Sequence, residues 1–170
     1  MEEIERCWCA VGDTGDAAWR EMRERATLGA TTLRFDAERT LDDRLFDTDE
    51  GGLGQVGLTL RLRSTPGAAW VTVKGPSIAT ADGTLTRPEW EASADRQSLV
   101  QALARVADWG GPTLALGVEP ADAAAGSDVG RLTRELAALG LHPRHRRRTR
   151  RLTRAVHLPA DVLFDNLFGI

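Results

Sequence analysis

Residues 46–76, FDTDEGGLGQVGLTLRLRSTPGAAWVTVKGP, decide the expected fold. They contain two β-type runs, Gly57–Arg63 and Ala69–Lys74, which are joined by the turn-forming stretch Ser64–Gly67. Side chains alternate between the two faces of a strand. One face of the pair is therefore apolar, and the other carries Thr59, Arg61, Arg63, Trp70, Thr72 and Lys74. The stretch predicts a hairpin whose apolar face must be covered by other elements.

The basic face of this hairpin has two interpretations. Two guanidiniums and an ammonium on adjacent strands suit phosphate oxygens, because arginine binds them bidentately and lysine acts as a point charge. The alternative is a half-exposed sheet whose basic residues simply face water. These residues alone leave the choice open. Lys74 is conspicuous because it is the only lysine in the sequence.

The rest of the chain predicts further strands and helices around the hairpin. Expected strands are Glu2–Ala10, Thr31–Asp36, Arg44–Asp47, Thr84–Ala92 and His142–Leu158, and expected helices are Asp13–Leu28, Arg96–Trp109 and Val129–Leu139. In the second helix Leu99, Val100 and Leu103 recur at helical spacing on the predicted apolar side. A length of 170 residues fits one domain, residues 1–170.

The composition is that of a globular protein, with 42% apolar and 28% charged residues. No apolar run is long enough for a membrane span and no signal peptide opens the chain, so we expect a cytoplasmic protein that does not enter membranes. The net charge of −3 conceals seven arginines in residues 144–154. That distribution indicates a local anion site and does not favour general nucleic-acid binding.

Paired carboxylates occur in two predicted strands. Glu3 and Glu5 would share a face of the first strand and offer hard oxygen ligands, the kind that Mg²⁺ or Mn²⁺ uses beside a phosphate. An acidic N-terminus without function is the alternative. Arg87, Glu89 and Glu91 would share a face of another strand, either as a solvated ladder of ion pairs or as the wall of a polar cavity.

Several motifs resemble the CYTH family, the triphosphate tunnel metalloenzymes, which include thiamine triphosphatases, inorganic triphosphatases and class IV adenylate cyclases. The family pattern is an aromatic-Asp-Thr turn, an LRxR strand and a strand ending in lysine. This sequence has Phe46-Asp47-Thr48, Leu60-Arg61-Leu62-Arg63 and Val71-Thr72-Val73-Lys74 in that order. The resemblance implies an α+β fold: an antiparallel β-barrel-like tunnel of about seven strands with polar inward positions and helices packed outside it.

The resemblance also implies an activity and a set of site residues. The activity is divalent-metal-dependent hydrolysis of a triphosphate, either inorganic, thiamine or nucleoside triphosphate, in a basic tunnel. Lys74, Arg61 and Arg63 are the implied catalytic residues, and Arg87 and Arg151 join them in binding substrate. Glu3, Glu5, Glu89, Glu91 and Asp165 are the implied ligands of Mg²⁺ or Mn²⁺.

The sequence departs from the family pattern at three places. Cys7 stands where the ExExK motif has its lysine, and Asp42 stands where relatives carry a basic residue. The sequence also stops at Ile170, before the last family strand, so we expect a shortened chain or a tunnel open along one side. A partner chain could fill that gap, which makes a homodimer an expectation.

These departures keep other functions open. One is a non-catalytic module of the same fold that binds triphosphate or another polyanion, and another is an adenylate cyclase of that fold. Nucleic-acid binding through residues 144–154 ranks last, because that run has no interleaved aromatic residues.

Overall fold

The computed structural model describes residues 15–28, 31–79, 85–117 and 128–157. The chain divides into two compact units, one of residues 39–150 and one of residues 1–38 with 151–170. Each unit is described by itself below.

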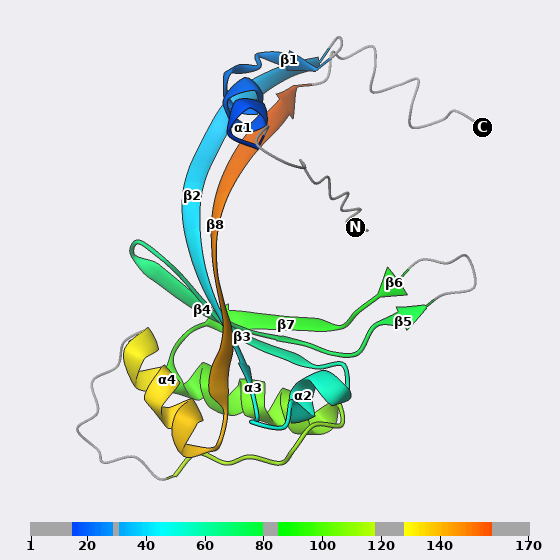
Figure 1. The fold of residues 1–170 in the computed structure, drawn as a ribbon, viewed down its shortest axis with the longest axis vertical. Helices are drawn as coiled ribbons and strands as arrows, with labels where there is room; N and C mark the ends of the chain where they lie inside the picture. Colours follow the sequence, from blue (N-terminus) through cyan, green and yellow to red (C-terminus); the bar gives the residue numbers. More distant parts are fainter. Residues whose placement is uncertain (1–14, 29–30, 80–84, 118–127, 158–170) are drawn as a thin grey trace. The chain divides into compact units, whose positions relative to one another are not determined.

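The larger unit is built on an antiparallel sheet, as the sequence predicts (Figure 1). Its strands are β2 (Thr31–Asp47, of which the second half belongs to this unit), β3 (Thr59–Thr65), β4 (Ala68–Lys74), β7 (Glu89–Ser93) and β8 (His142–His157). The order runs β2-β3-β4-β7, and β8 pairs with β2. Two short strands, β5 (Ile78–Ala79) and β6 (Leu85–Thr86), pair separately. With its helices the unit has the expected α+β architecture.

The hairpin of β3 and β4 has the two predicted faces. Leu60, Leu62, Val71 and Val73 are fully buried, while the intervening Arg61 on β3 points to the other face. The strands are joined at Gly67, whose positive φ of 87° is readily adopted only by glycine. The apolar face of the hairpin therefore forms one side of the hydrophobic core.

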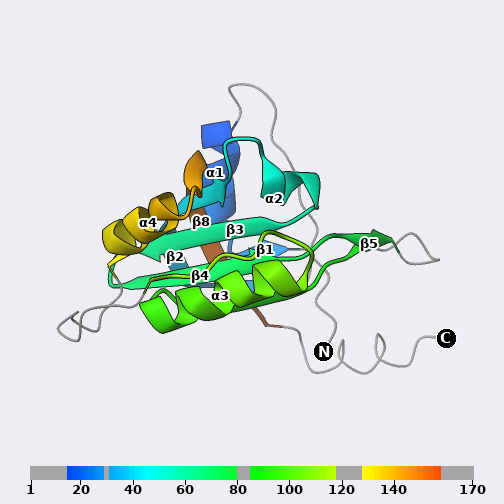
Figure 2. The same ribbon diagram turned by 90° about the horizontal axis from the view of Figure 1, so that it is seen from below.

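Two helices cover that apolar face. Helix α3 (Arg96–Asp108) packs on β4 and β7 (Figure 2), and helix α4 (Val129–Ala138) contributes Leu132 and Leu136 to the same core cluster. Both helices begin at a capping aspartate, because the Asp95 carboxylate accepts a hydrogen bond from the Ser98 amide at 2.7 Å and Asp128 caps α4 likewise.

Two predicted elements are divided differently in the structure, and one residue predicted on an apolar helix face is exposed. The helix expected over residues 13–28 is α1 (Gly15–Glu24), followed by strand β1 (Thr27–Leu28). The strand expected over residues 84–92 is interrupted at Pro88, which lacks the backbone N–H that a sheet requires. Val100, expected on the apolar side of its helix, is 46% exposed instead.

Strand β2 is continuous over Thr31–Asp47, although the sequence indicates two strands with a loop between them. Its middle is rich in charged residues, which normally mark loops. Here these residues have partners on neighbouring strands: Asp43 contacts Arg63 of β3, and Asp42 contacts Arg146 of β8. Cross-strand ion pairing thus allows the strand to run through a charged segment.

The Phe46-Asp47-Thr48 motif forms a turn that leads into the short helix α2 (Gly52–Gln55). The Asp47 carboxylate accepts hydrogen bonds from the amides of Thr48 at 2.8 Å, Leu53 at 2.7 Å and Gly54 at 3.0 Å. The Thr48 hydroxyl accepts one from the Gly52 amide at 2.8 Å. The motif therefore satisfies backbone donors at the start of a helix, which is a structural role.

In the smaller unit, α1 precedes β1, which pairs with the first residues of β2. The Arg154 guanidinium donates hydrogen bonds to the carbonyls of Met22 and Arg23 at the end of α1. Arg23 also pairs with Glu38 at 3.4 Å. Among the helices in the described ranges, none combines the length and apolarity needed to cross a membrane.

Candidate anion-binding site

Strand registry brings residues of four strands, most of them polar, together on the face of the sheet opposite the helices. Arg61 lies directly opposite Leu45 on one side and Thr72 on the other, and Thr72 lies opposite Glu91. In the next row Lys74 lies between Thr59 and Glu89. Directly opposed residues in antiparallel strands project to the same face, so each row presents its side chains to one side.

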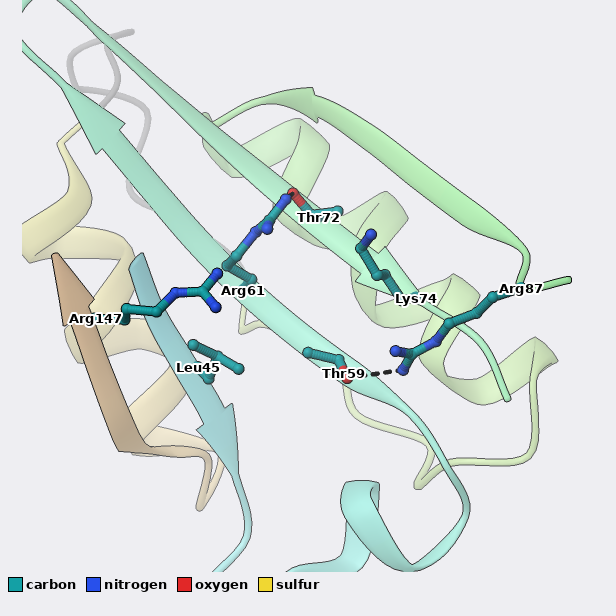
Figure 3. Close-up of a pocket in the computed structure, with 7 residues that line it drawn as sticks. All are labelled: Leu45, Thr59, Arg61, Thr72, Lys74, Arg87 and Arg147. Carbon is teal, nitrogen blue, oxygen red and sulfur yellow. Dashed lines mark hydrogen bonds between the residues drawn. The ribbon is translucent and has the colours of Figure 1, made fainter. Parts of the chain in front are cut away.

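A pocket of about 280 Å³ opens on this face (Figure 3). Its lining residues come from four strands and the link before β7: Leu45, Thr59, Arg61, Thr72, Lys74, Arg87 and Arg147. In Figure 3 the helices lie behind the strands that carry these side chains. Arg61 and Lys74, the two residues that the sequence singles out most strongly, thus share one pocket.

Arg61 is the most buried cation of the pocket, with a side chain only 12% exposed. One terminal nitrogen lies 3.1 Å from the Thr72 hydroxyl and 3.3 Å from Glu91, but its Nε–H has no hydrogen-bond partner. Burial, and next the neighbouring Arg63 charge, lower the pKa of Arg61 from its ordinary value. A buried cationic donor without a partner is costly.

Two glutamates at the edge of the pocket balance its cations. Lys74 Nζ lies 2.7 Å from Glu89, and the Thr72 hydroxyl donates a hydrogen bond of 2.7 Å to Glu91. Both glutamate side chains are 42% exposed. Their charges reduce the repulsion among the basic groups while the pocket is empty.

Arg87 lines the pocket but uses several of its donors on the protein itself. Its guanidinium donates to the carbonyls of Gly75 and Gly57, the latter at 3.0 Å, and to the Thr59 hydroxyl at 2.8 Å. These bonds join the link before β7 to β3 and to the end of β4. Arg87 therefore fixes one wall of the pocket in addition to adding positive charge.

Arg63 is predicted to bind substrate, but it is not among the residues that line the pocket. It forms a bidentate ion pair with the fully buried Asp43, with N–O distances of 2.7 and 2.9 Å. Arg147 donates a third hydrogen bond to Asp43 at 3.1 Å. Burial opposes ionisation of Asp43, but the bonds from Arg63 and Arg147 outweigh it, so the pKa of Asp43 lies below its ordinary value.

Arg147 is the basic pocket residue that the sequence does not single out. The arginine run made Arg151 the expected late basic residue, whereas Arg151 belongs to the smaller unit and does not line the pocket. Side chains alternate between the two faces of β8, so residues 147, 149 and 151 lie on the same face. This alternation is the feature of the sequence that could have indicated Arg147.

Other arginines of the run pair with aspartates: Arg144 lies 3.2 Å from Asp49, and Arg146 forms two hydrogen bonds with Asp42. The contact with Arg146 is the main reason that the pKa of Asp42 is lowered. These pairs neutralise part of the positive charge that the sequence concentrates in residues 144–154.

The predicted metal ligands are only partly within the described ranges. Glu3, Glu5 and Asp165 lie outside them, as does Cys7. Within residues 15–28, 31–79, 85–117 and 128–157, no group of three or more His, Cys, Asp or Glu side chains is placed to hold a metal ion. Glu89 and Glu91 offer the carboxylate oxygens that Mg²⁺ and Mn²⁺ accept, so the donor chemistry at the pocket edge fits such an ion.

Taken together, the described residues form a basic pocket with carboxylates at its edge on an antiparallel sheet.

No protein-family model and no curated protein matches the sequence. Several solved structures are similar in part, among them the following two. HpAC1 from Hippeastrum, described as a proposed adenylyl cyclase with a dominant triphosphatase activity, shares 21% identity over 46% of this chain and 46% of its own, with a TM-score of 0.37. The PH1819 protein from Pyrococcus horikoshii OT3 shares 18% identity over 84% of this chain and 60% of its own, with a TM-score of 0.49.

Proposed function

We propose that the pocket binds the triphosphate group of a small molecule and that the protein hydrolyses it with Mg²⁺ or Mn²⁺. The observation that carries the proposal is that four cationic side chains, Arg61, Lys74, Arg87 and Arg147, line one pocket. Guanidinium groups are complementary to phosphate oxygens, and several cations around one pocket suit a ligand with several negative charges.

Each residue would have a role that follows from the chemistry of its side chain. Arg61 and Arg147 would each contact phosphate oxygens through a planar guanidinium, and Lys74 would add a point charge. Phosphoryl transfer depends on positioning and on charge stabilisation more than on covalent chemistry, which these groups supply. A bound divalent cation would be held by Glu89 and Glu91 and would polarise the transferred phosphoryl group.

The test is phosphate release from tripolyphosphate in the presence of Mg²⁺ or Mn²⁺. Arg61→Ala should lower the rate by about 100-fold, the usual effect of losing one buried donor at a developing charge. Arg105→Ala is the matched control, because this arginine lies on α3 outside the pocket and is 49% exposed. Equal rates for wild type and Arg61→Ala would refute the proposal.

The second candidate is a module that binds triphosphate without hydrolysing it. Cys7 and Asp42 favour it, since both stand where the resembled family carries basic residues. Calorimetry with tripolyphosphate separates the two candidates, because tight binding without phosphate release supports the module. Formation of a cyclic nucleotide from ATP would support the cyclase of the same fold.

A further inference from the structure

The buried carboxylate of Asp43 connects two arginines from different strands. Its Oδ1 accepts from Arg63 Nε at 2.7 Å, and its Oδ2 accepts from a terminal nitrogen of Arg63 at 2.9 Å and one of Arg147 at 3.1 Å. We infer that Asp43 is a positioning residue that holds the Arg147 guanidinium at the pocket. This inference rests on the proposed anion-binding function.

The sheet gives Asp43 a central position for this role. It lies on β2 directly opposite Arg63 of β3, and β8, which carries Arg147, pairs with β2 as well. Both oxygens of the carboxylate are used, and the side chain is 0% exposed. The anchor is therefore rigid, and it leaves the remaining donors of Arg147 available to the pocket.

Arg147 needs such an anchor because its side chain is 64% exposed. A long exposed arginine samples many rotamers, and a ligand that recruits it must overcome the loss of that freedom. A buried partner restricts the rotamers before the ligand arrives, which favours binding. Lys74 also has a carboxylate partner, Glu89, but that side chain is 42% exposed.

Asp43 also offsets repulsion within the arginine cluster. Arg63 lowers the pKa of the neighbouring Arg61, whereas the Asp43 charge raises it. Removing the Asp43 charge would therefore have two opposite effects on anion binding: it would add positive potential and would release Arg147. Only the second effect depends on geometry, so a control that changes the charge alone is required.

Asp42 provides that control. It is adjacent to Asp43 in sequence, and its carboxylate pairs with Arg146, which does not line the pocket. The measurement is calorimetric titration of the purified protein with tripolyphosphate. Asp43→Asn should weaken binding about tenfold, as loss of an outer partner does at metal sites. Asp42→Asn should bind as tightly as wild type or more tightly. Equal affinities of the two variants would overturn the inference.

A double-mutant cycle separates positioning from a general structural effect. If Asp43 acts through Arg147, then Asp43→Asn causes no further loss of affinity in an Arg147→Met background. Additive losses would overturn the inference. Should Asp43→Asn not fold, Arg147→Lys replaces it, because lysine keeps the charge but lacks the guanidinium fork. Affinity of Arg147→Lys equal to wild type would then overturn the inference.

A control on the same strand is Arg144→Met, since Arg144 pairs with Asp49 and does not line the pocket. Arg147→Met should bind more weakly than Arg144→Met, and equal binding would remove Arg147 from the site. Failure of the wild-type protein to bind tripolyphosphate would refute the proposed function and this inference together. Wild-type binding with an unaffected Asp43→Asn variant would refute the inference alone.

Discussion

Replacing Asp47 by alanine should destabilise the fold without weakening anion binding. Its carboxylate accepts hydrogen bonds from the amides of Thr48, Leu53 and Gly54 at 2.8, 2.7 and 3.0 Å. The bonds from Thr48 and Leu53 are partly buried, so water replaces the lost acceptor poorly. Asp47 does not line the pocket, although it belongs to the motif on which the family resemblance depends.

The expected cost follows from these contacts. A stranded, partly buried backbone donor costs about 1 kcal/mol or more, and two such donors give about 2 kcal/mol. This lies at the upper end of the cost of losing a helix-capping side chain, about 0.5–2 kcal/mol. With a urea slope of about 2 kcal/mol per M, the unfolding midpoint should fall by about 1 M.

The assay is urea denaturation of wild type, Asp47→Ala and the control Asp49→Ala. Asp49 lies in the same turn, but its side chain is 69% exposed and its ion pair is with Arg144, a side chain that is 47% exposed, so its loss should cost no more than about 0.5 kcal/mol. Tripolyphosphate affinity is then measured on the folded variants. The structural role would be refuted if Asp47→Ala were as stable as Asp49→Ala, or if it kept its stability and lost affinity.

Three further predictions concern the hydrophobic core, the close contact between Gly75 and Pro88, and the pH dependence of stability. Leu60→Ala should lower the free energy of unfolding by about 2–5 kcal/mol in urea denaturation, whereas Val100→Ala at a 46% exposed site should have little effect. Gly75→Ala should lower the thermal midpoint, because its new Cβ would lie 2.5 Å from Pro88 Cγ; an unchanged midpoint would contradict this. The pKa of Asp43 is lowered by folding, so its charge stabilises the protein above the unfolded pKa of about 3.9 and ceases to do so as pH falls through the folded value. The stability gap between wild type and Asp43→Asn should therefore be full at pH 7 and shrink in acid, and a gap that is independent of pH would argue against the ion pair.

Local patterns in the sequence predicted the hairpin well. Alternation placed Leu60 and Val71 in the core and Arg61 and Lys74 on the other face, because this pattern depends only on the period of a strand. Helices α3 and α4 begin at the residues predicted from the sequence, Arg96 and Val129, because helical periodicity is also a local pattern.

Features that depend on distant partners could not be predicted. A buried Asp43 in mid-strand contradicts simple patterning, and only the arrival of Arg63 and Arg147 makes its burial tolerable. The Asp43 carboxylate binds both arginines, and of the two only Arg147 lines the pocket. Nothing in the arginine run itself distinguishes residue 147 from its neighbours except strand parity, whose register the sequence leaves open.

The presence of a single lysine gives the pocket a built-in chemical reporter. Lys74 Nζ is the only side-chain amine of the sequence and is partly exposed. An acylating reagent would consequently modify one internal position, and the mass of the peptide that contains it would record the reaction. Occupancy of the pocket could then be followed as protection of that peptide from the reagent, without any measurement of turnover.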